Sequence, residues 1–449
     1  MVNDREFLNM KILHTSDWHL GRSLHKNKRY DEFESFLDWL YKTVLEEKIE
    51  HVLVAGDIFD NTTPSNRAQE LYYKFLCRTA SVSQNVVIIA GNHDSPTFLN
   101  APKEVLKYLN IHVVGSITDD LNDEVLILND NRNNRKSLIV CAVPFLRDRD
   151  IRKSEAGETI ETKELKVIEG ISNHYNSVCE IALQKQKELD VGIPIVVMGH
   201  LYTQGGKTSD GDGVRELYVG SLGHINKDIF PGYIDYVALG HLHVPQKVKD
   251  RDSIYTQTNP SFENLSPHPA LNSPVEIPKT KIPPVYYSGS PIPMGFGEAG
   301  QQKKINIIEF DNGIMSIHEK LIPEFRVLRK ISGNIDDIKK ELLELKSTAS
   351  SAWVEVEYNG DELIGDLREL LESVTEGSEI NIHTIKNQRI KDPIINSIDT
   401  TETLDELTEN EVFNRCLILN DIPLEQRNEL TAAYDEILLH IHESDVNAE

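Results

Sequence analysis

Side chains that can bind metal ions follow apolar stretches at five places before residue 244. At four of them the stretch runs into a glycine and the next residue is the donor, as in Gly56-Asp57, Gly91-Asn92, Gly199-His200 and Gly240-His241. At the fifth, the stretch KILHTS ends directly in Asp17-Trp18-His19. Ligands of open α/β sheets bind beyond the carboxyl ends of the strands, and glycine lets the backbone turn sharply there. We therefore expect all five places to converge on one edge of the sheet.

The expected donor set is Asp17, His19, Asp57, Asn92, His200, His241 and His243. This set exceeds what one four-coordinate ion needs, but it suits two ions of five or six ligands each, with waters filling the remainder. One carboxylate must then bridge the ions, and Asp57 is the best candidate because it lies between the two ligand groups in chain order. Two divalent ions about 3.5–4 Å apart can clamp a phosphate, generate a hydroxide nucleophile and stabilise in-line displacement.

The chemistry of these donors also limits the metal. Mixed imidazole, carboxylate and carboxamide ligation without thiolate suits Mn²⁺, Fe or Zn²⁺, whereas Mg²⁺ favours oxygen alone. Each motif by itself is weak, because a strand-end aspartate is often only a helix cap and a lone histidine is usually a structural residue. The full ordered set, with each member after an apolar strand, indicates a dinuclear centre.

Longer motifs surround these donors: ILHTSDWHLGR (12–22), AGDIFDNTTPS (55–65), AGNHDS (90–95), VPFLRDRD (143–150), ALGHLH (238–243) and YSGSPIPMGF (287–296). On these motifs the chain resembles the calcineurin-like metallophosphoesterases. Within them it is similar to the nuclease subunits of bacterial DNA-break-processing complexes, from about residue 10 to 440. The resemblance implies that Asp17, His19 and His243 hold one ion. It also implies that Asn92, His200 and His241 hold the other, with Asp57 bridging both.

The resemblance also implies a catalytic role for His93, which stands next to Asn92. This histidine would protonate the leaving 3′ oxygen or stabilise the charged phosphate. Asp94 either orients His93 or serves only as a turn or cap residue. Many relatives carry a second histidine at the position of Asp60, so no role is transferred to that residue.

The activity implied by the resemblance is that of a DNA nuclease subunit. It would act as a Mn²⁺-dependent 3′→5′ exonuclease on double-stranded ends and as an endonuclease on hairpins and single strands, with Mg²⁺ or other ions as alternatives. Its partner would be an SbcC-type coiled-coil ATPase, with two copies of each subunit in a heterotetramer that acts in replication, recombination and repair. An alternative keeps the dinuclear core for a small-molecule or phosphoprotein phosphatase. A scaffold protein without turnover would have lost ligands, and none is missing.

Strand-like and helix-like patterns alternate from residue 10 to about 320, which indicates an α/β fold. We expect a layered metallophosphoesterase β-sandwich flanked by helices, with a helix over 31–45 and buried strands at 52–55 and 86–90. After residue 326 the order is βαβαβ, which predicts a small α+β domain. The predicted segments are an extension (1–9), the nuclease domain (10–322, with a loop insertion at 251–285), a DNA-binding cap (323–400) and a helical partner-binding tail (401–449).

The formal net charge of −25 opposes DNA binding, because phosphate binding normally requires a basic surface. Local basic residues are the candidates for phosphate contacts: Arg22, Lys26, Lys28, Arg29, Arg147, Arg149 and Arg152. Part of the negative charge would face the ATPase, and an apolar stripe in the acidic tail would dock on it through Val412, Phe413 and Leu417. Alternatively, this stripe packs on the chain's own second domain.

The sequence has no run of 18 apolar residues and no apolar segment of signal-peptide type in residues 1–9. Its four cysteines, Cys77, Cys141, Cys179 and Cys416, form no C-x-x-C pair. We therefore expect a cytoplasmic protein with free thiols and no membrane partner.

Overall fold

The computed structural model describes residues 10–387 apart from 83–84, 131–134, 153–158, 190–191, 208–224, 250–281, 312–313, 349–350, 361, 363 and 365, together with residues 413, 417, 427, 430, 431 and 434. The chain forms two compact units, Met1–Arg326 and Val327–Glu449. The predicted extension (1–9), nearly all of the predicted insertion (251–285) and most of the predicted tail lie outside the described residues.

The first sheet of the first unit has the order β14-β13-β1-β4-β5-β6. Four of its strands are parallel: β1 (Met10–Thr15), β4 (His51–Ala55), β5 (Asn85–Ile89) and β6 (Ile111–Val114). Of the other two, β13 (Lys304–Asp311) pairs antiparallel with β1, and β14 (Ile314–Leu321) pairs antiparallel with β13 at the edge of the sheet. The carboxyl ends of β1, β4 and β5 therefore lie at one edge of this sheet.

The second sheet has the order β11-β12-β10-β9-β8-β7. Its parallel strands are β12 (Val285–Tyr287), β10 (Tyr236–Gly240), β9 (Ile195–His200) and β8 (Arg135–Ala142). The short β11 (Gln246–Lys247) and the edge strand β7 (Val125–Asp130) run antiparallel to their neighbours. Here too the carboxyl ends of the central strands β9 and β10 lie side by side.

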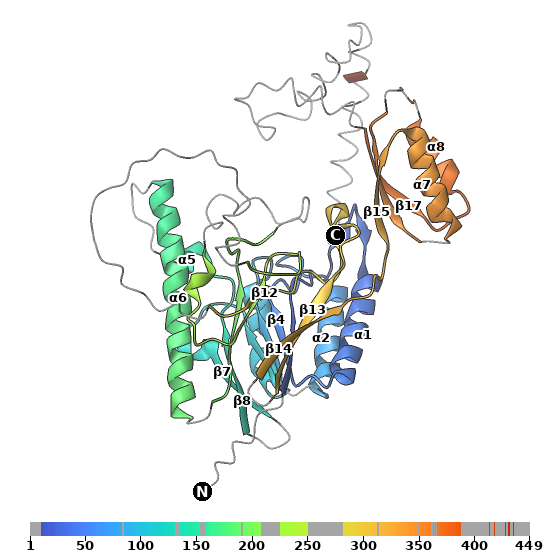
Figure 1. The fold of residues 1–449 in the computed structure, drawn as a ribbon. Coiled ribbons are helices and arrows are strands. Elements are labelled where there is room, and N and C mark those ends of the chain that lie inside the picture. The colour runs from blue at the N-terminus through green and yellow to red at the C-terminus, as the bar shows by residue number, and fades with distance from the viewer. Residues whose placement is uncertain are drawn as a thin grey trace. The chain divides into compact units, whose positions relative to one another are not determined.

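The two sheets pack face to face, and helices cover their outer faces (Figure 1). Alternate residues of each sheet, such as Leu53, Ile89, Val140 and Met198, form the core between the sheets. Helices α1 (Tyr30–Glu46) and α2 (Asn66–Ala80) pack on the other face of the first sheet, and α6 (Ile160–Glu188) packs on that of the second. The predicted layered sandwich of the metallophosphoesterase fold is confirmed.

Local predictions in this unit agree with the structure to within one or two residues. The helix expected over 31–45 is α1, whose buried stripe includes Phe33, Phe36 and Leu40. The strands expected at 52–55 and 86–90 are β4 and β5, in which every residue is buried. Short elements fill the connections: β2 (Ser23–Leu24), β3 (Asn27–Lys28), α3 (Pro96–Asn100), α4 (Lys103–Lys107), α5 (Asp148–Ile151), η1 (Leu121–Glu124), η3 (Lys227–Ile229) and η5 (Phe296–Glu298).

The second unit contains a three-stranded parallel sheet of order β15-β16-β17. Its elements follow the predicted βαβαβ order: β15 (Leu328–Gly333), α7 (Ile335–Ser347), β16 (Trp353–Tyr358), α8 (Leu367–Thr375) and β17 (Asn381–Asn387). The Asn334 side chain caps α7 by accepting hydrogen bonds from the backbone N–H groups of Asp336 and Asp337. Apolar residues of the sheet and both helices, including Val354, Ile338 and Leu371, form a separate core.

Candidate metal centre

The structure brings the seven predicted donors together, but at the carboxyl ends of strands from two sheets and not at one edge of a single sheet as expected. Asp17 and His19 follow β1, Asp57 follows β4, Asn92 follows β5, His200 ends β9, and His241 and His243 follow β10. Five of them are at most 2% exposed: Asp17, His19, Asp57, His200 and His243. Buried polar and charged side chains are costly unless they are hydrogen-bonded, paired or bound to a metal. The gathering of these donors therefore indicates a binding site.

The backbone of the loops after β1 and β4 is held in an unusual conformation. The N–H of Asp17 donates to the carbonyl of Gly56, and the N–H of His19 donates to the carbonyl of Asp57, both at 3.0 Å. Asp17, His19 and Asp57 have positive φ angles of 52°, 47° and 48°, and His241 has one of 102°. Non-glycine residues adopt such angles rarely and at a cost, and they cluster at functional sites.

Two of the glycines that precede donors lie where the two sheets pack too closely for a side chain. A Cβ atom on Gly56, whose φ is 86°, would collide with the His200 ring. A Cβ atom on Gly240 would collide with the carbonyl oxygen of Ala55. Glycine therefore lets β4 and β10 approach until their donors share one centre.

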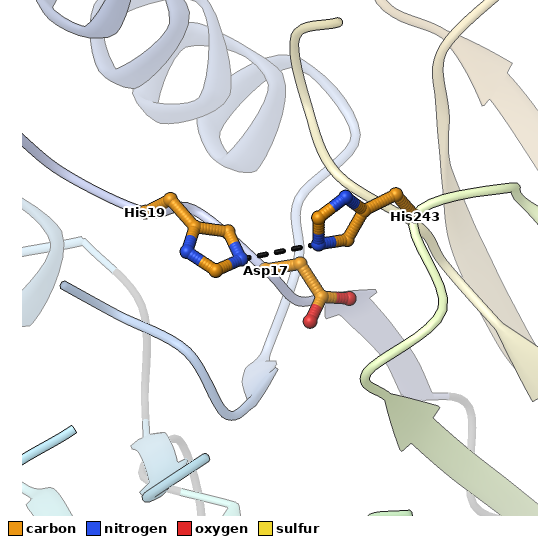
Figure 2. A group of neighbouring side chains, drawn as sticks. All are labelled: Asp17, His19 and His243. Carbon is orange, nitrogen blue, oxygen red and sulfur yellow. Dashed lines mark hydrogen bonds between the residues drawn. The ribbon is translucent and has the colours of Figure 1, made fainter. Parts of the chain in front are cut away.

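The first group of donors is Asp17, His19 and His243. The Nε2 atoms of the two histidines lie 3.1 Å apart and face one another, with the Asp17 carboxylate beside them (Figure 2). The Asp17 carboxylate is itself oriented, because its Oδ1 accepts the N–H of His241 at 2.9 Å and its Oδ2 accepts the Ser16 hydroxyl at 2.6 Å. These three side chains can hold one cation.

The second group contains Asn92, His200 and His241. The Asn92 Oδ1 atom lies 3.0 Å from His200 Nε2 and 3.1 Å from His241 Nδ1. The other ring nitrogen of His200, Nδ1, donates to the carbonyl of Ala55 at 3.0 Å. This hydrogen bond fixes the ring so that Nε2 faces the centre, an arrangement typical of metal-binding histidines.

Asp57 lies between the two groups. Its Oδ2 is 3.6 Å from His19 Nε2 and 3.3 Å from His200 Nε2, while its Oδ1 accepts the N–H of His93 at 2.9 Å. Neighbouring ligand atoms around one ion with bonds near 2.1 Å are about 3 Å apart. The residues present therefore fit two cations that share Asp57.

Burial and neighbouring charges shift the pKa values of several residues in the centre. Burial lowers the pKa of His200, but the attraction of Asp57 outweighs it and raises this pKa to about 9. Burial and the proximity of His200 lower the pKa of His241 to about 3. Burial opposes the charge of Asp57, yet the imidazoles, with His200 foremost, hold its pKa well below the usual range. Asp57 is thus an anion that attracts positive charge, and a bound cation would take the place of the His200 proton.

His93 lies beside the first group, with its ring edge-on to His19 and the ring centroids 4.8 Å apart. Its Nδ1 donates to the backbone carbonyl of Asp60 at 2.9 Å, so Nε2 is the ring nitrogen that could contact a ligand. His93 also comes within ligand distance of His19 and Asp57. Geometry alone therefore allows either the catalytic role or a place as a ligand.

The Asp94 carboxylate binds backbone N–H groups of two loops, which agrees with the turn or cap role of the two alternatives for this residue. Its carboxylate accepts the N–H groups of Ile58, Phe59 and Gly91 at 3.1, 3.0 and 2.9 Å. Burial and the nearby charge of Asp57 raise the pKa of Asp94 to about 6. Asp94 therefore joins the loop after β4 to the loop after β5.

Comparison with known proteins agrees with this geometry. The family model described as calcineurin-like phosphoesterase matches residues 10–245, and the model described as type 5 capsule protein repressor C-terminal domain matches residues 324–420. The SbcD component of the SbcCD nuclease of Escherichia coli K12 is 30% identical over 428 residues, which cover 94% of this chain and 96% of that protein. The chain belongs to the SbcD family of calcineurin-like phosphoesterases.

Two further members of the SbcD family match over shorter ranges. The SbcD protein of Rhodobacter capsulatus is 28% identical and the match covers 71% of each chain. The SbcD protein of Bacillus subtilis is 29% identical, over 68% of this chain and 67% of that one. The protein is therefore a hydrolase of a nuclease family, which favours the main prediction over the phosphatase alternative.

Two carboxylates at the centre have no role assigned from the sequence: Glu298 lies outside the predicted set, and no role is transferred to Asp60. Glu298 in η5 has its Oε1 atom 3.2 Å from His243 Nδ1, and Asp60 has its Oδ1 atom 3.5 Å from His19 Nδ1. Glu298 follows the motif YSGSPIPMGF, which ends at Phe296, so it is close to a family motif but outside it. Burial raises the pKa of Glu298, but His243 and Lys303 overcome this and hold it at about 2.

Several basic residues expected to contact phosphate are already paired with carboxylates. Arg29 is buried and forms a 2.6 Å ion pair with Glu32, so it is not available to DNA. Arg152 is paired with Asp148 at 2.6 Å. Arg149 also lies 3.5 Å from a carboxylate oxygen, that of Asp150, but 79% of its side chain is exposed, so it stays accessible. A basic residue in the sequence therefore does not by itself indicate a phosphate contact.

The residues predicted to bind the partner are only partly described. Val412 lies outside the described residues. Phe413 is half-buried and stacks on Tyr434, with the ring centroids 3.9 Å apart. Leu417 is only 6% exposed, so this chain already covers it. Among the helices in the described part of the chain, none combines the length and the apolar character that crossing a membrane needs.

Proposed function

We propose that this protein is the metal-dependent nuclease subunit of a complex that processes DNA ends in replication, recombination and repair. The observation that carries the proposal is the position of Asp57 Oδ2 between imidazoles of two donor groups, 3.6 Å from His19 and 3.3 Å from His200, in a chain of the SbcD family. We also propose that seven residues hold the ions: Asp17, His19, Asp57, Asn92, His200, His241 and His243.

The chain's own residues would divide the work of phosphodiester cleavage between them. Two bound divalent ions would supply charge stabilisation for the phosphate and activation of water. His93, whose Nδ1 is held by the Asp60 carbonyl, would present Nε2 to the leaving 3′ oxygen or to the phosphate. Asp94 would keep the loops of Asp57 and Asn92 in register through its backbone hydrogen bonds.

The proposed ions are Mn²⁺, as the family resemblance implies. The mixed imidazole, carboxylate and carboxamide donors without thiolate are compatible with Mn²⁺, and also with Fe or Zn²⁺. The proposed substrates are double-stranded ends, attacked in the 3′→5′ direction, and hairpins or single strands, attacked internally. Groups that act on phosphate carry no base information, so cleavage should depend on DNA ends and shape. The proposed location is the cytoplasm.

The decisive experiment purifies the protein with and without an SbcC-type coiled-coil ATPase. An end-labelled hairpin DNA is then incubated with each preparation in Mg²⁺, Mn²⁺ or Zn²⁺. We expect cleavage that is strongest in Mn²⁺ and that extends to long or blocked DNA only with the partner and ATP. Hydrolysis of phosphomonoesters without cleavage of any DNA would contradict the proposal.

We further propose that the protein forms a homodimer within a heterotetramer. An apolar patch on α4 and the turn after it supports this arrangement: Val105, Tyr108 and Leu109 are 69%, 92% and 41% exposed. Exposed apolar residues that gather in this way are usually covered by a partner. Tyr108→Glu should lower the mass measured by light scattering to that of a monomer. Leu321→Glu, at an exposed apolar residue of β14, is the matched control and should leave the mass unchanged.

The remaining assignments concern the second unit and the tail. We propose that residues 323–400 form a cap that contacts DNA, and that residues 401–449 bind the ATPase partner. Phe413 is only half-buried, and the exposed part of its side chain supports partner binding. The burial of Leu417 within this chain limits the surface available to a partner.

A further inference from the structure

A buried ion pair lies directly behind one of the candidate ligands. Glu298 and Lys303 are 0% and 3% exposed, and Lys303 Nζ lies 2.5 Å from Glu298 Oε2. Glu298 Oε1 lies 3.2 Å from Nδ1 of His243. A buried carboxylate is costly unless it is paired and hydrogen-bonded, so its position at the metal centre requires a reason.

The surroundings of Glu298 fix its carboxylate in one orientation. The Oε2 atom accepts hydrogen bonds from the Ser290 hydroxyl at 3.3 Å and from the Met294 N–H at 3.0 Å, in addition to Lys303. Lys303 also donates to the backbone carbonyl of His243 at 3.2 Å. The other oxygen, Oε1, therefore points toward the His243 ring and cannot rotate away without breaking several hydrogen bonds.

This arrangement determines which nitrogen of His243 faces the centre. When Nδ1–H donates to Glu298, the lone pair of Nε2 points toward the centre, where Nε2 lies 3.1 Å from Nε2 of His19. By contrast, the Nδ1 atom of His200 donates its hydrogen bond to a neutral carbonyl, that of Ala55. A carboxylate partner both fixes the ring and increases its basicity as a ligand.

We propose that Glu298, held by Lys303, is a positioning residue for His243 and thereby sets the affinity of one of the two cation sites. This inference rests on the proposed two-metal function. Residues that orient a metal ligand in this way change metal affinity by about 10–100-fold when they are removed. Because Glu298 contacts His243 and lies behind only the first donor group, its loss should weaken one site and spare the other.

The test measures Mn²⁺ binding to the chelator-treated full chain, by calorimetry and by the electron paramagnetic resonance signal of free Mn²⁺. We expect two bound ions in the wild type. Glu298→Gln should weaken one of them by about 10–100-fold and leave the other unchanged. Lys303→Met should act in the same direction. Combining Glu298→Gln with His243→Ala should weaken binding no further than His243→Ala alone, because both changes act on one ligand.

Glu124→Gln is the matched control. Glu124 is equally buried and its Oε2 lies 2.8 Å from His174 Nε2, but this pair joins η1 to α6 and includes none of the seven donors. The control should leave both Mn²⁺ affinities unchanged even if it lowers thermal stability. Wild-type binding of both ions by folded Glu298→Gln, or equal weakening of both, would overturn the positioning role. Fewer than two Mn²⁺ in the wild type would instead refute the proposed two-metal function.

Discussion

Replacing Asp57 with asparagine tests the central assumption of the mechanism, that one carboxylate serves both cation sites. In the wild type, Asp57 Oδ1 accepts the N–H of His93 at 2.9 Å. Asparagine keeps the shape of the side chain, and its Oδ1 can still accept this N–H. In place of Oδ2 it can put an NH₂ group, which cannot bind a cation, toward His19 and His200. The variant therefore removes one charge from the centre with little change in volume.

The expected loss follows from that charge. Oδ2 is the atom that approaches imidazoles of both donor groups, so both sites lose an anionic ligand together. We expect about 4 kcal/mol of lost transition-state stabilisation, on the order of a 10³-fold lower rate, together with weaker binding of both ions. The negative charge that raises the pKa of His200 to about 9 also disappears, so this pKa should fall.

The assay combines single-turnover cleavage of end-labelled duplex DNA with the metal content measured after gel filtration. Asp235→Asn is a control for the loss of a carboxylate in the same unit, since Asp235 Oδ2 accepts the N–H of Ile195 at 2.9 Å at the start of β9. The control should keep both metals and its cleavage rate. Two tightly bound ions with near-normal turnover in Asp57→Asn would refute the bridging assignment.

Three other predictions concern separate parts of the chain. His93→Leu should keep both metals and DNA binding but lose about 10²–10⁴-fold in cleavage rate, and a parallel fall in metal content would show that His93 is a ligand. Burial lowers the pKa of His14 to about 3, so its contribution to stability is complete above pH 6.5 and is lost as the pH falls toward 3. The free energy of unfolding in urea should accordingly be about 2 kcal/mol lower at pH 5 than at pH 7.5 through this group, and His14→Gln should reduce that difference. Deleting residues 401–449, or changing Phe413 to Asp, should abolish co-purification with the ATPase and retain cleavage of small substrates; loss of that cleavage would indicate that the tail packs on the catalytic unit.

The convergence of the donors could be predicted because it depends on topology alone. Apolar strands that end in glycine and a donor place those donors at the carboxyl ends of parallel strands, and Asp57, Asn92 and His200 lie there. The expectation of one edge of a single sheet was wrong, because the donors follow strands of two sheets whose carboxyl ends meet. The sandwich and the helix α1 could be predicted for the same reason, because apolar periodicity records burial. Whether each donor binds metal stays a prediction.

Contacts that depend on loop conformation could not be predicted. Glu298 reaches His243 only through the turn of η5, and the ring of His93 is held by a backbone carbonyl, which every residue carries. Burial of charge is equally hidden, as Arg29 demonstrates by its ion pair with Glu32 beneath the surface. A residue's type in the sequence limits its chemistry but does not give its environment.

The origin of the donors in two different sheets has a consequence for unfolding. Asp17, Asp57 and Asn92 follow strands of one sheet, whereas His200, His241 and His243 come from the other. Cations shared by these residues would act as cross-links between the two halves of the sandwich. A ligand that binds only the native state, at a concentration 100 times its Kd, raises the free energy of unfolding by about 2.7 kcal/mol. Separation of the sheets and release of the metals would then be one event, and amide hydrogens of β4 and β9 should exchange together and more slowly once Mn²⁺ is bound.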